Sequence, residues 1–215
     1  MNNTDFINRI AEVYVDARAL AYGDFQSQIK RGKSHSISGK AEDLFALFLA
    51  KNLNDQSLKY FVDKPISFRV NEQSRKKAIQ PDLFIMNKSG VVTHYFDLKM
   101  DLGWQRELQP YLKDKNELIQ QIRGKKASYK SGGEKHQVTF SDNLVYQIII
   151  LSGKNINGDA LESHKVFCTP FDTLKLYVLT SGVHLNMYGN DKREHLKIHD
   201  EEFEKLMQDT RSLLQ

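Results

Sequence analysis

Residues 79–102, IQPDLFIMNKSGVVTHYFDLKMDL, are the stretch that decides the fold of this chain. The apolar run 82–86 and the run 91–98, rich in β-branched and aromatic residues, predict two strands. The segment 87–90, Asn-Lys-Ser-Gly, has the composition of a tight turn. Pro81 precedes the first strand, where its missing N–H does least harm to sheet pairing. The stretch therefore predicts an antiparallel hairpin.

Charged side chains gather at one end of this predicted hairpin. Side chains alternate between the two faces of a strand, so Asp97 and Lys99 point to one face and Leu98 points to the other. In an antiparallel pair of this length, the start of one strand lies beside the end of its partner. Asp82 is therefore expected near Asp97 and Lys99, so that two carboxylates and one ammonium group converge.

The spacing of these residues resembles a nuclease signature. Pro81-Asp82, a gap of fourteen residues and then Asp97-Leu98-Lys99 resemble the motif of the PD-(D/E)XK nucleases, the restriction-endonuclease-like superfamily. The triplet that ends in Lys99 is the only acid-x-Lys triplet in the chain. Members of this family often carry an additional acid upstream, and Glu42 lies at that position. The resemblance covers roughly residues 38–103.

The resemblance implies a Mg²⁺-dependent DNA endonuclease, such as a type II restriction enzyme or a defence or mobile-element enzyme. It makes Glu42, Asp82, Asp97 and Lys99 the catalytic residues. The three carboxylates would hold Mg²⁺, with Mn²⁺ as the alternative, because hard oxygen ligands suit a hard cation. Lys99 would orient or help deprotonate the attacking water. DNA is the expected partner, and cleavage of both strands favours a homodimer.

Other interpretations of the same residues remain open. A repair or junction-resolving nuclease would use the same chemistry, whereas a nucleic-acid-binding module on the same fold would not cut. An unrelated α/β protein would hold Asp82 and Asp97 far apart. The charged residues would otherwise form a structural salt bridge around Lys99, with Glu42 as a first-turn acid that the helix dipole favours.

The rest of the chain predicts one α/β domain, residues 1–215, with a restriction-endonuclease-like core in which helices flank a central mixed β-sheet. An N-terminal helix, 5–22, is expected before a catalytic core of about 38–152, and C-terminal strands and a helix complete the domain at 165–214. Further helices are expected at 38–53, 114–126 and 200–214. Further strands are expected at 59–70 with a break at Pro65, and at 144–151, 165–169 and 183–188, while 171–178 is helix or strand.

Basic residues indicate where a polyanion would bind. The chain has a net charge of +4 and a pI of about 9.0, a balance that leans weakly toward nucleic acid. The segments 25–41 and 125–136 are expected to be basic loops, and the resemblance implies that a helix near 114–126 turns Gln120 or Gln121 toward the catalytic residues. The residues expected to contact nucleic acid are Lys30, Arg31, Lys33, Lys40, Gln121, Lys125, Lys126 and Lys130.

Composition limits the compartment. With 40% hydrophobic and 27% charged residues, the chain has the make-up of a globular protein rather than a disordered or membrane protein. No apolar run approaches the roughly 18 residues of a membrane span, and the N-terminus lacks the pattern of a signal peptide. The single Cys168 cannot form an internal disulfide. We therefore expect a cytoplasmic protein that is independent of membranes.

Overall fold

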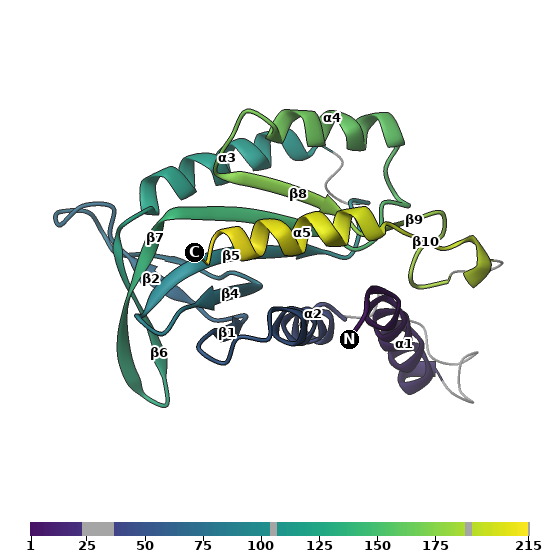
Figure 1. Cartoon of the computed structure of the whole chain (residues 1–215), viewed down its shortest axis with the longest axis horizontal. Coiled ribbons are helices and arrows are strands. Elements are labelled where there is room, and N and C mark those ends of the chain that lie inside the picture. The colour runs from purple at the N-terminus through teal and green to yellow at the C-terminus, as the bar shows by residue number, and fades with distance from the viewer. Residues whose placement is uncertain (23–36, 104–106, 188–190, 215) are drawn as a thin grey trace.

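The computed structural model describes residues 1–22, 37–103, 107–187 and 191–214. It has an eight-stranded mixed sheet flanked by helices, the α/β class that the sequence predicted (Figure 1). The strand order is β1-β4-β5-β7-β6-β2-β3, with β8 also paired to β7. The strands are β1 (Lys59–Val62), β2 (Ile66–Phe68), β3 (Lys77–Ile79), β4 (Leu83–Met86), β5 (Val91–Lys99), β6 (Lys126–Ser131), β7 (Glu134–Ile150) and β8 (Leu174–Val178).

Helices cover both faces of this sheet. In Figure 1, α3 and α4 lie above the strands and α1 and α2 lie below them. None of the described helices combines the length and the apolar character needed to cross a membrane. The helices are α1 (Asn3–Tyr22), α2 (Ser38–Leu53), α3 (Leu108–Ile122), α4 (Gly158–Cys168) and α5 (Asp200–Ser212).

The centre of the sheet is the parallel pair formed by β5 and β7. Residues 144–150 in the second half of β7 are buried, as expected for a strand covered on both faces. β7 changes partners along its length, because its first half pairs antiparallel with β6 and its second half pairs parallel with β8. It therefore joins the two halves of the sheet.

Two hydrophobic clusters hold the layers together. The first packs α1, α2 and α5 on one face of the sheet, and in it the ring centroids of Phe6 and Phe48 lie 5.0 Å apart. The ring of Phe45 meets that of Phe96 on β5 edge-on at 5.4 Å. The second cluster packs buried residues of α3 against β7, including Leu112, on the other face. Burial on both faces explains the apolar sequences of the central strands.

Several predicted elements are confirmed. The hairpin lies where residues 79–102 placed it, with β4 and β5 antiparallel and a turn at 87–90. The N-terminal helix, the helix from residue 38 and the closing helix also lie at their expected positions. Pro65 separates β1 from β2, because it has no N–H to donate to a ladder.

The expected helix at 114–126 was placed too late. α3 runs from Leu108 to Ile122, six residues earlier at its start. Leu108 and Leu112 are both buried and continue the inward stripe of the helix. Pro110 lies in the first turn, where a helix tolerates its missing N–H. This earlier start changes which side chains of α3 reach the catalytic region.

The expected loop at 125–136 is wrong. It is a hairpin in which β6 and the start of β7 pair around Gly132 and Gly133. Both glycines have positive φ, +58° and +85°, as the two-residue turns that suit hairpins require. Ala127 and Tyr129 both point inward, and the flanking Lys126 and Lys130, with Ser128 on the other face, hid this period in the sequence.

Two predicted C-terminal strands are also wrong. Residues 165–168 end α4, whose start is capped by the Asn157 side chain accepting from the Asp159 N–H at 2.8 Å. The described part of 183–188 forms no strand, and the short pair β9 (Thr180–Ser181) and β10 (Lys197–Ile198) lies on either side of it. The segment 171–178 contains β8, and β3 was not predicted.

The turn after β9 supplies a test of this fold. Gly182 has φ +87°, and a Cβ added there would collide with the carbonyl oxygen of His195. Gly133 has a nearly equal φ of +85° but open space around it. Both Gly→Ala variants should lose about 1 kcal/mol from backbone strain, and Gly182→Ala should lose at least about 2 kcal/mol more because of the clash. Urea unfolding measures both, and equal midpoints for the two variants would contradict the contact.

Candidate active site

The predicted convergence of charged groups is present in the structure. The β4–β5 register pairs Leu83 with Phe96, which brings Asp82, one residue before β4, next to Asp97. The Leu98 N–H donates to Asp82 Oδ2 at 2.6 Å. Lys99 Nζ lies 2.7 Å from Asp97 Oδ1. The two carboxylates and the ammonium group therefore meet where β4 begins and β5 ends.

Asp97 is buried and held by three donors. The hydroxyl groups of Tyr111 on α3 and Tyr146 on β7 both donate to Asp97 Oδ2, while Lys99 contacts Oδ1. Burial by itself raises the pKa of the Asp97 carboxyl, but Lys99 and the two hydroxyl donors outweigh it, so the pKa is lowered. Asp97 is therefore the carboxylate that stays charged.

Asp82 behaves in the opposite way. Burial and then the negative charge of Asp97 raise its pKa to about 7, although the Leu98 N–H bond works in the other direction. Two neighbouring carboxylates that cannot both ionise freely separate in pKa in this manner. The site therefore exchanges one proton near neutral pH, and Asp82 holds it.

Glu42 lies on α2, past the first turn of that helix, so it is not the first-turn acid considered above. It is only 8% exposed. Burial, followed by the negative charges of Asp63, Asp43 and Asp97, raises its pKa. Among the described residues, no hydrogen-bond donor or cation contacts its carboxylate. Glu42 therefore adds a third negative charge to the field at Asp82 without being balanced itself.

A second ammonium group lies on α3. Lys115 follows Tyr111 by one helical turn, and its Nζ lies 4.9 Å from the Tyr111 ring centroid and 5.3 Å from that of Tyr146. Burial is the main cause that lowers the pKa of Lys115. Neither Tyr111, Tyr146 nor Lys115 was predicted from the sequence. The spacing of Tyr111 and Lys115 would have placed both on one helix face, had the helix been started early enough.

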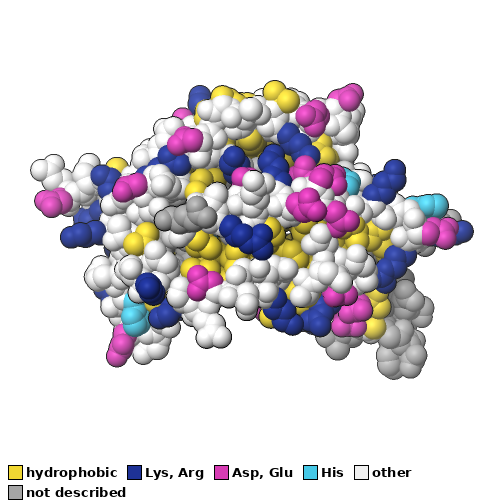
Figure 2. Space-filling view, viewed as in Figure 1, with side chains coloured by type: hydrophobic (Ala, Val, Ile, Leu, Met, Phe, Trp, Pro, Cys, Tyr) yellow, Lys and Arg dark blue, Asp and Glu magenta, His cyan; other side chains and the backbone are white. Residues whose placement is uncertain are grey.

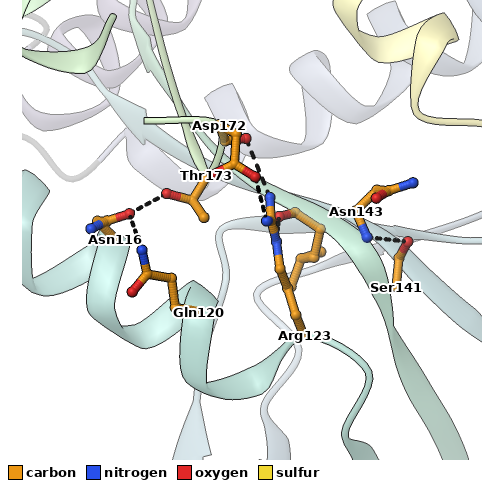
Figure 3. A network of polar contacts seen from close by, with 8 residues as sticks. Asn116, Gln120, Arg123, Ser141, Asn143, Asp172 and Thr173 are labelled. Carbon is orange, nitrogen blue, oxygen red and sulfur yellow. Dashed lines mark hydrogen bonds and ion pairs between the residues drawn. The ribbon is translucent and has the colours of Figure 1, made fainter. Parts of the chain in front are cut away.

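Polar contacts fix α3 in position over the sheet (Figure 3). Arg123, directly after the helix, forms an ion pair with Asp172 at 2.6 Å. Seven residues earlier, or about two helical turns, Asn116 Oδ1 accepts hydrogen bonds from the Thr173 hydroxyl and from Gln120 Nε2, the latter at 3.3 Å. These contacts tie the helix to the segment that enters β8. Gln120 is thus engaged within α3 and does not reach the carboxylates.

The residues expected to contact nucleic acid lie in several places. Gln121 is exposed, six residues beyond Lys115 or about 9 Å along the helix, and its expected contact with nucleic acid stays a prediction. Lys40 is exposed on α2. The remaining lysines at 125, 126 and 130 are exposed on or beside β6. Lys30, Arg31 and Lys33 lie outside the described residues.

The donor chemistry of the site suits a hard divalent cation. Asp82, Asp97 and Glu42 offer only oxygen ligands. Burial and then mutual repulsion raise the pKa of Asp82 and Glu42, and a bound cation would offset both by favouring the charged carboxylates. Within the described residues, no three or more His, Cys, Asp or Glu side chains are grouped closely enough to hold a metal ion. Glu42, Asp82 and Asp97 therefore do not form the grouped set of three ligands that was expected, and only the adjacent pair Asp82 and Asp97 could share a cation.

Comparisons with models of protein families, with curated proteins and with solved structures found no match to this chain. The resemblance to PD-(D/E)XK nucleases therefore rests on Asp82, Asp97, Lys99 and the acid at position 42. What the site does has to be inferred from its own side chains.

The raised pKa of Asp82 makes stability depend on pH. An unfolded Asp loses its proton near pH 4, whereas folded Asp82 keeps it until about pH 7. The folded state thus binds more protons between these values, and its stability falls as pH rises through them. Asp82→Asn mimics the protonated form, since its amide can accept from Leu98 and donate to Asp97. In EDTA at pH 8 the variant should be more stable than the wild type by about 1–3 kcal/mol, with no gain at pH 4.

Urea unfolding at the two pH values checks this expectation. Asp16→Asn, at an exposed position on α1, is the control and should change stability by less than about 0.5 kcal/mol at either pH. A lower stability of Asp82→Asn at pH 8 would show that the Asp82 charge is compensated in the folded protein.

Proposed function

We propose that this protein is a metal-dependent nuclease that hydrolyses phosphodiester bonds in DNA, with its active site where β4 begins and β5 ends. The observation that supports the proposal is the position of Asp82 beside Asp97, with Lys99 Nζ 2.7 Å from the Asp97 carboxylate. Paired carboxylates with an adjacent ammonium group resemble the PD-(D/E)XK arrangement. A homodimer would present one such site to each strand of a duplex.

The carboxylates have separate tasks in this proposal. Asp97 is kept ionised by Lys99, Tyr111 and Tyr146, so it supplies a permanent negative charge for a cation. Asp82 would give its proton to solvent in order to hold a cation, and Glu42 adds negative charge from the α2 side. When bound there, Mg²⁺ would lower the pKa of a water molecule and offset charge on the phosphate.

Two ammonium groups, those of Lys99 and Lys115, lie near the carboxylates and could interact with a phosphate. The Lys99 side chain is one quarter exposed, so its Nζ reaches solvent while contacting Asp97. From this position it can orient the attacking water and stabilise charge that develops on the phosphate oxygens. Lys115 lies behind the two tyrosine rings and adds a second positive charge near the carboxylates.

A second candidate is a nucleic-acid-binding module that does not cut. The observation in its favour is that both oxygens of the Asp97 carboxylate already accept from protein donors, as in a purely structural charge network. In that case Lys99 and the tyrosines would balance a buried charge rather than prepare it for a cation. Binding and cleavage experiments distinguish the two candidates.

Mg²⁺ should stabilise the folded protein even without substrate. A cation that binds the folded state raises stability by RT ln(1 + [L]/Kd), which is about 2.7 kcal/mol at a hundredfold excess over Kd. We expect millimolar Mg²⁺ to raise the Tm of the wild type at pH 8, and Asp97→Asn to lose this rise because one carboxylate charge is removed. Differential scanning calorimetry measures both, and an equal rise in the two proteins would place the cation elsewhere.

Cleavage itself tests the catalytic assignment. Asp97→Asn and Lys99→Ala should each lower Mg²⁺-dependent cleavage of plasmid DNA by about 10²–10⁴-fold, because the first removes a charge that would hold the cation and the second removes the group that orients the water. Lys113→Ala, at an exposed position on α3, is the charge-matched control and should cut normally. EDTA should abolish cutting by all active forms.

The products separate the possible roles of a nuclease. Discrete fragments would indicate a sequence-specific endonuclease, and preferential cutting of branched DNA would indicate a repair or junction-resolving enzyme. Cutting that survives both Asp97→Asn and Lys99→Ala would contradict the proposed site. If the protein binds nucleic acid without a metal and cuts no nucleic acid, the binding module is favoured.

A further inference from the structure

A basic groove of about 450 Å³ lies between β2, β6 and the first half of β7. The groove lies at the opposite end of β5 from Asp97. Lys126 at its edge pairs with Thr139 on β7, and Thr139 in turn pairs with Val91, the first residue of β5. The eight residue-to-residue steps from Val91 to Lys99 correspond to about 26 Å. The groove is therefore a separate site from the carboxylates.

The groove uses a sheet face that no described helix covers. Ile66, Phe68, Ala127 and Tyr129 point into the second hydrophobic cluster, so their strand neighbours point the other way. No described residue of β2 or β6 belongs to the first cluster, which α1, α2 and α5 cover. On this open face, hydroxyl and amide groups line the floor of the groove. They belong to Ser67, Ser128 and Gln137.

Cations dominate the rim. Among the described residues that line the groove, one is acidic, Glu72, and five are basic. All five are exposed, and none forms an ion pair with another described residue. Lys and Arg side chains also gather at the left end of the molecule in Figure 2, where β2 lies in Figure 1. The basic residues of the rim are Arg69, Lys76, Lys125, Lys126 and Lys135.

One pair of lysines next to the groove destabilises the folded protein through charge repulsion. Lys130 on β6 and Lys135 on β7 are directly opposite each other in the antiparallel ladder. Like charges at such positions are destabilising, by roughly 0.2–1 kcal/mol. Natural proteins break local rules of this kind mainly at functional sites. A polyanion seated over the hairpin would remove the repulsion.

We propose that this groove binds the phosphate backbone of a nucleic acid, several nucleotides away from the phosphate at the carboxylate site. Exposed cations contact phosphate oxygens, and the hydroxyl and amide groups of the floor can hydrogen-bond to phosphate or sugar. The choice of a nucleic acid as the occupant rests on the proposed nuclease function. The anion site itself rests on the charges and the open sheet face alone.

Binding of a fluorescent 20-base-pair duplex to the full chain in EDTA tests this proposal without any cleavage. Lys126→Ala/Lys135→Ala should weaken binding about 10–100-fold and make the slope of log K against log salt about 1.8 less negative, as for two lost phosphate contacts. Lys51→Ala/Lys205→Ala removes the same charge from exposed positions on α2 and α5. This control should keep the wild-type slope.

The outcomes are distinct. Unchanged binding of Lys126→Ala/Lys135→Ala, or equal losses in both double variants, would overturn the groove as the contact surface. Groove-dependent binding to anionic phospholipid vesicles that is tighter than binding to the duplex would overturn the nucleic acid as its occupant. Lys135→Ala removes a like-charge pair and should not lower stability, and urea unfolding of the double variant separates a binding loss from unfolding.

Hydrolysis of a small chromogenic phosphodiester, which is too short to reach the groove, separates this proposal from the nuclease function. The groove variant should hydrolyse it at the wild-type rate. If no form of the protein hydrolyses it while the groove still binds duplex, the nuclease function fails and the groove stands.

Discussion

The parallel ladder between β5 and β7 is the constraint on which the rest of the structure depends. Its backbone groups are paired on both sides, and helices cover both of its faces. Charged side chains are therefore tolerated mainly at its ends, where Asp97 and Lys99 lie. The same ladder brings β7 beside β5, so that the hydroxyl of Tyr146 reaches the Asp97 carboxylate. The position and the protonation of this carboxylate follow from the pairing of two apolar strands.

The neighbouring carboxyl groups of the site differ in pKa because their surroundings differ. Asp97 has three donors and a lowered pKa, while its neighbour Asp82 has one backbone donor and a raised pKa. Glu42 is buried with a raised pKa as well. Burial of partly compensated carboxylates costs stability in the isolated protein, which is typical of sites shaped for a ligand rather than for folding.

The parts predictable from the sequence are those that depend on near neighbours. The hairpin and the approach of Asp82 to Asp97 follow from strand period and turn composition within some twenty residues. Tyr111 lies only 14 residues from Asp97 and was missed because the helix that carries it was started too late, whereas Tyr146 lies 49 residues away and no local pattern connects it to Asp97. The strand β6 was missed because Lys126 and Lys130, on either side of Ala127 and Tyr129, gave it the composition of a loop.

The separation of these partners along the chain also orders their assembly. The hairpin that joins Asp82 to Leu98 closes over 16 residues, whereas the bond from Tyr146 to Asp97 closes over 49 and requires the parallel ladder. Short closures are entropically cheaper and faster than long parallel pairings. On the ribosome, residue 102 is added 44 residues before residue 146. We therefore expect the nascent chain to bring its two carboxylates together before it contains the tyrosine that orients one of them.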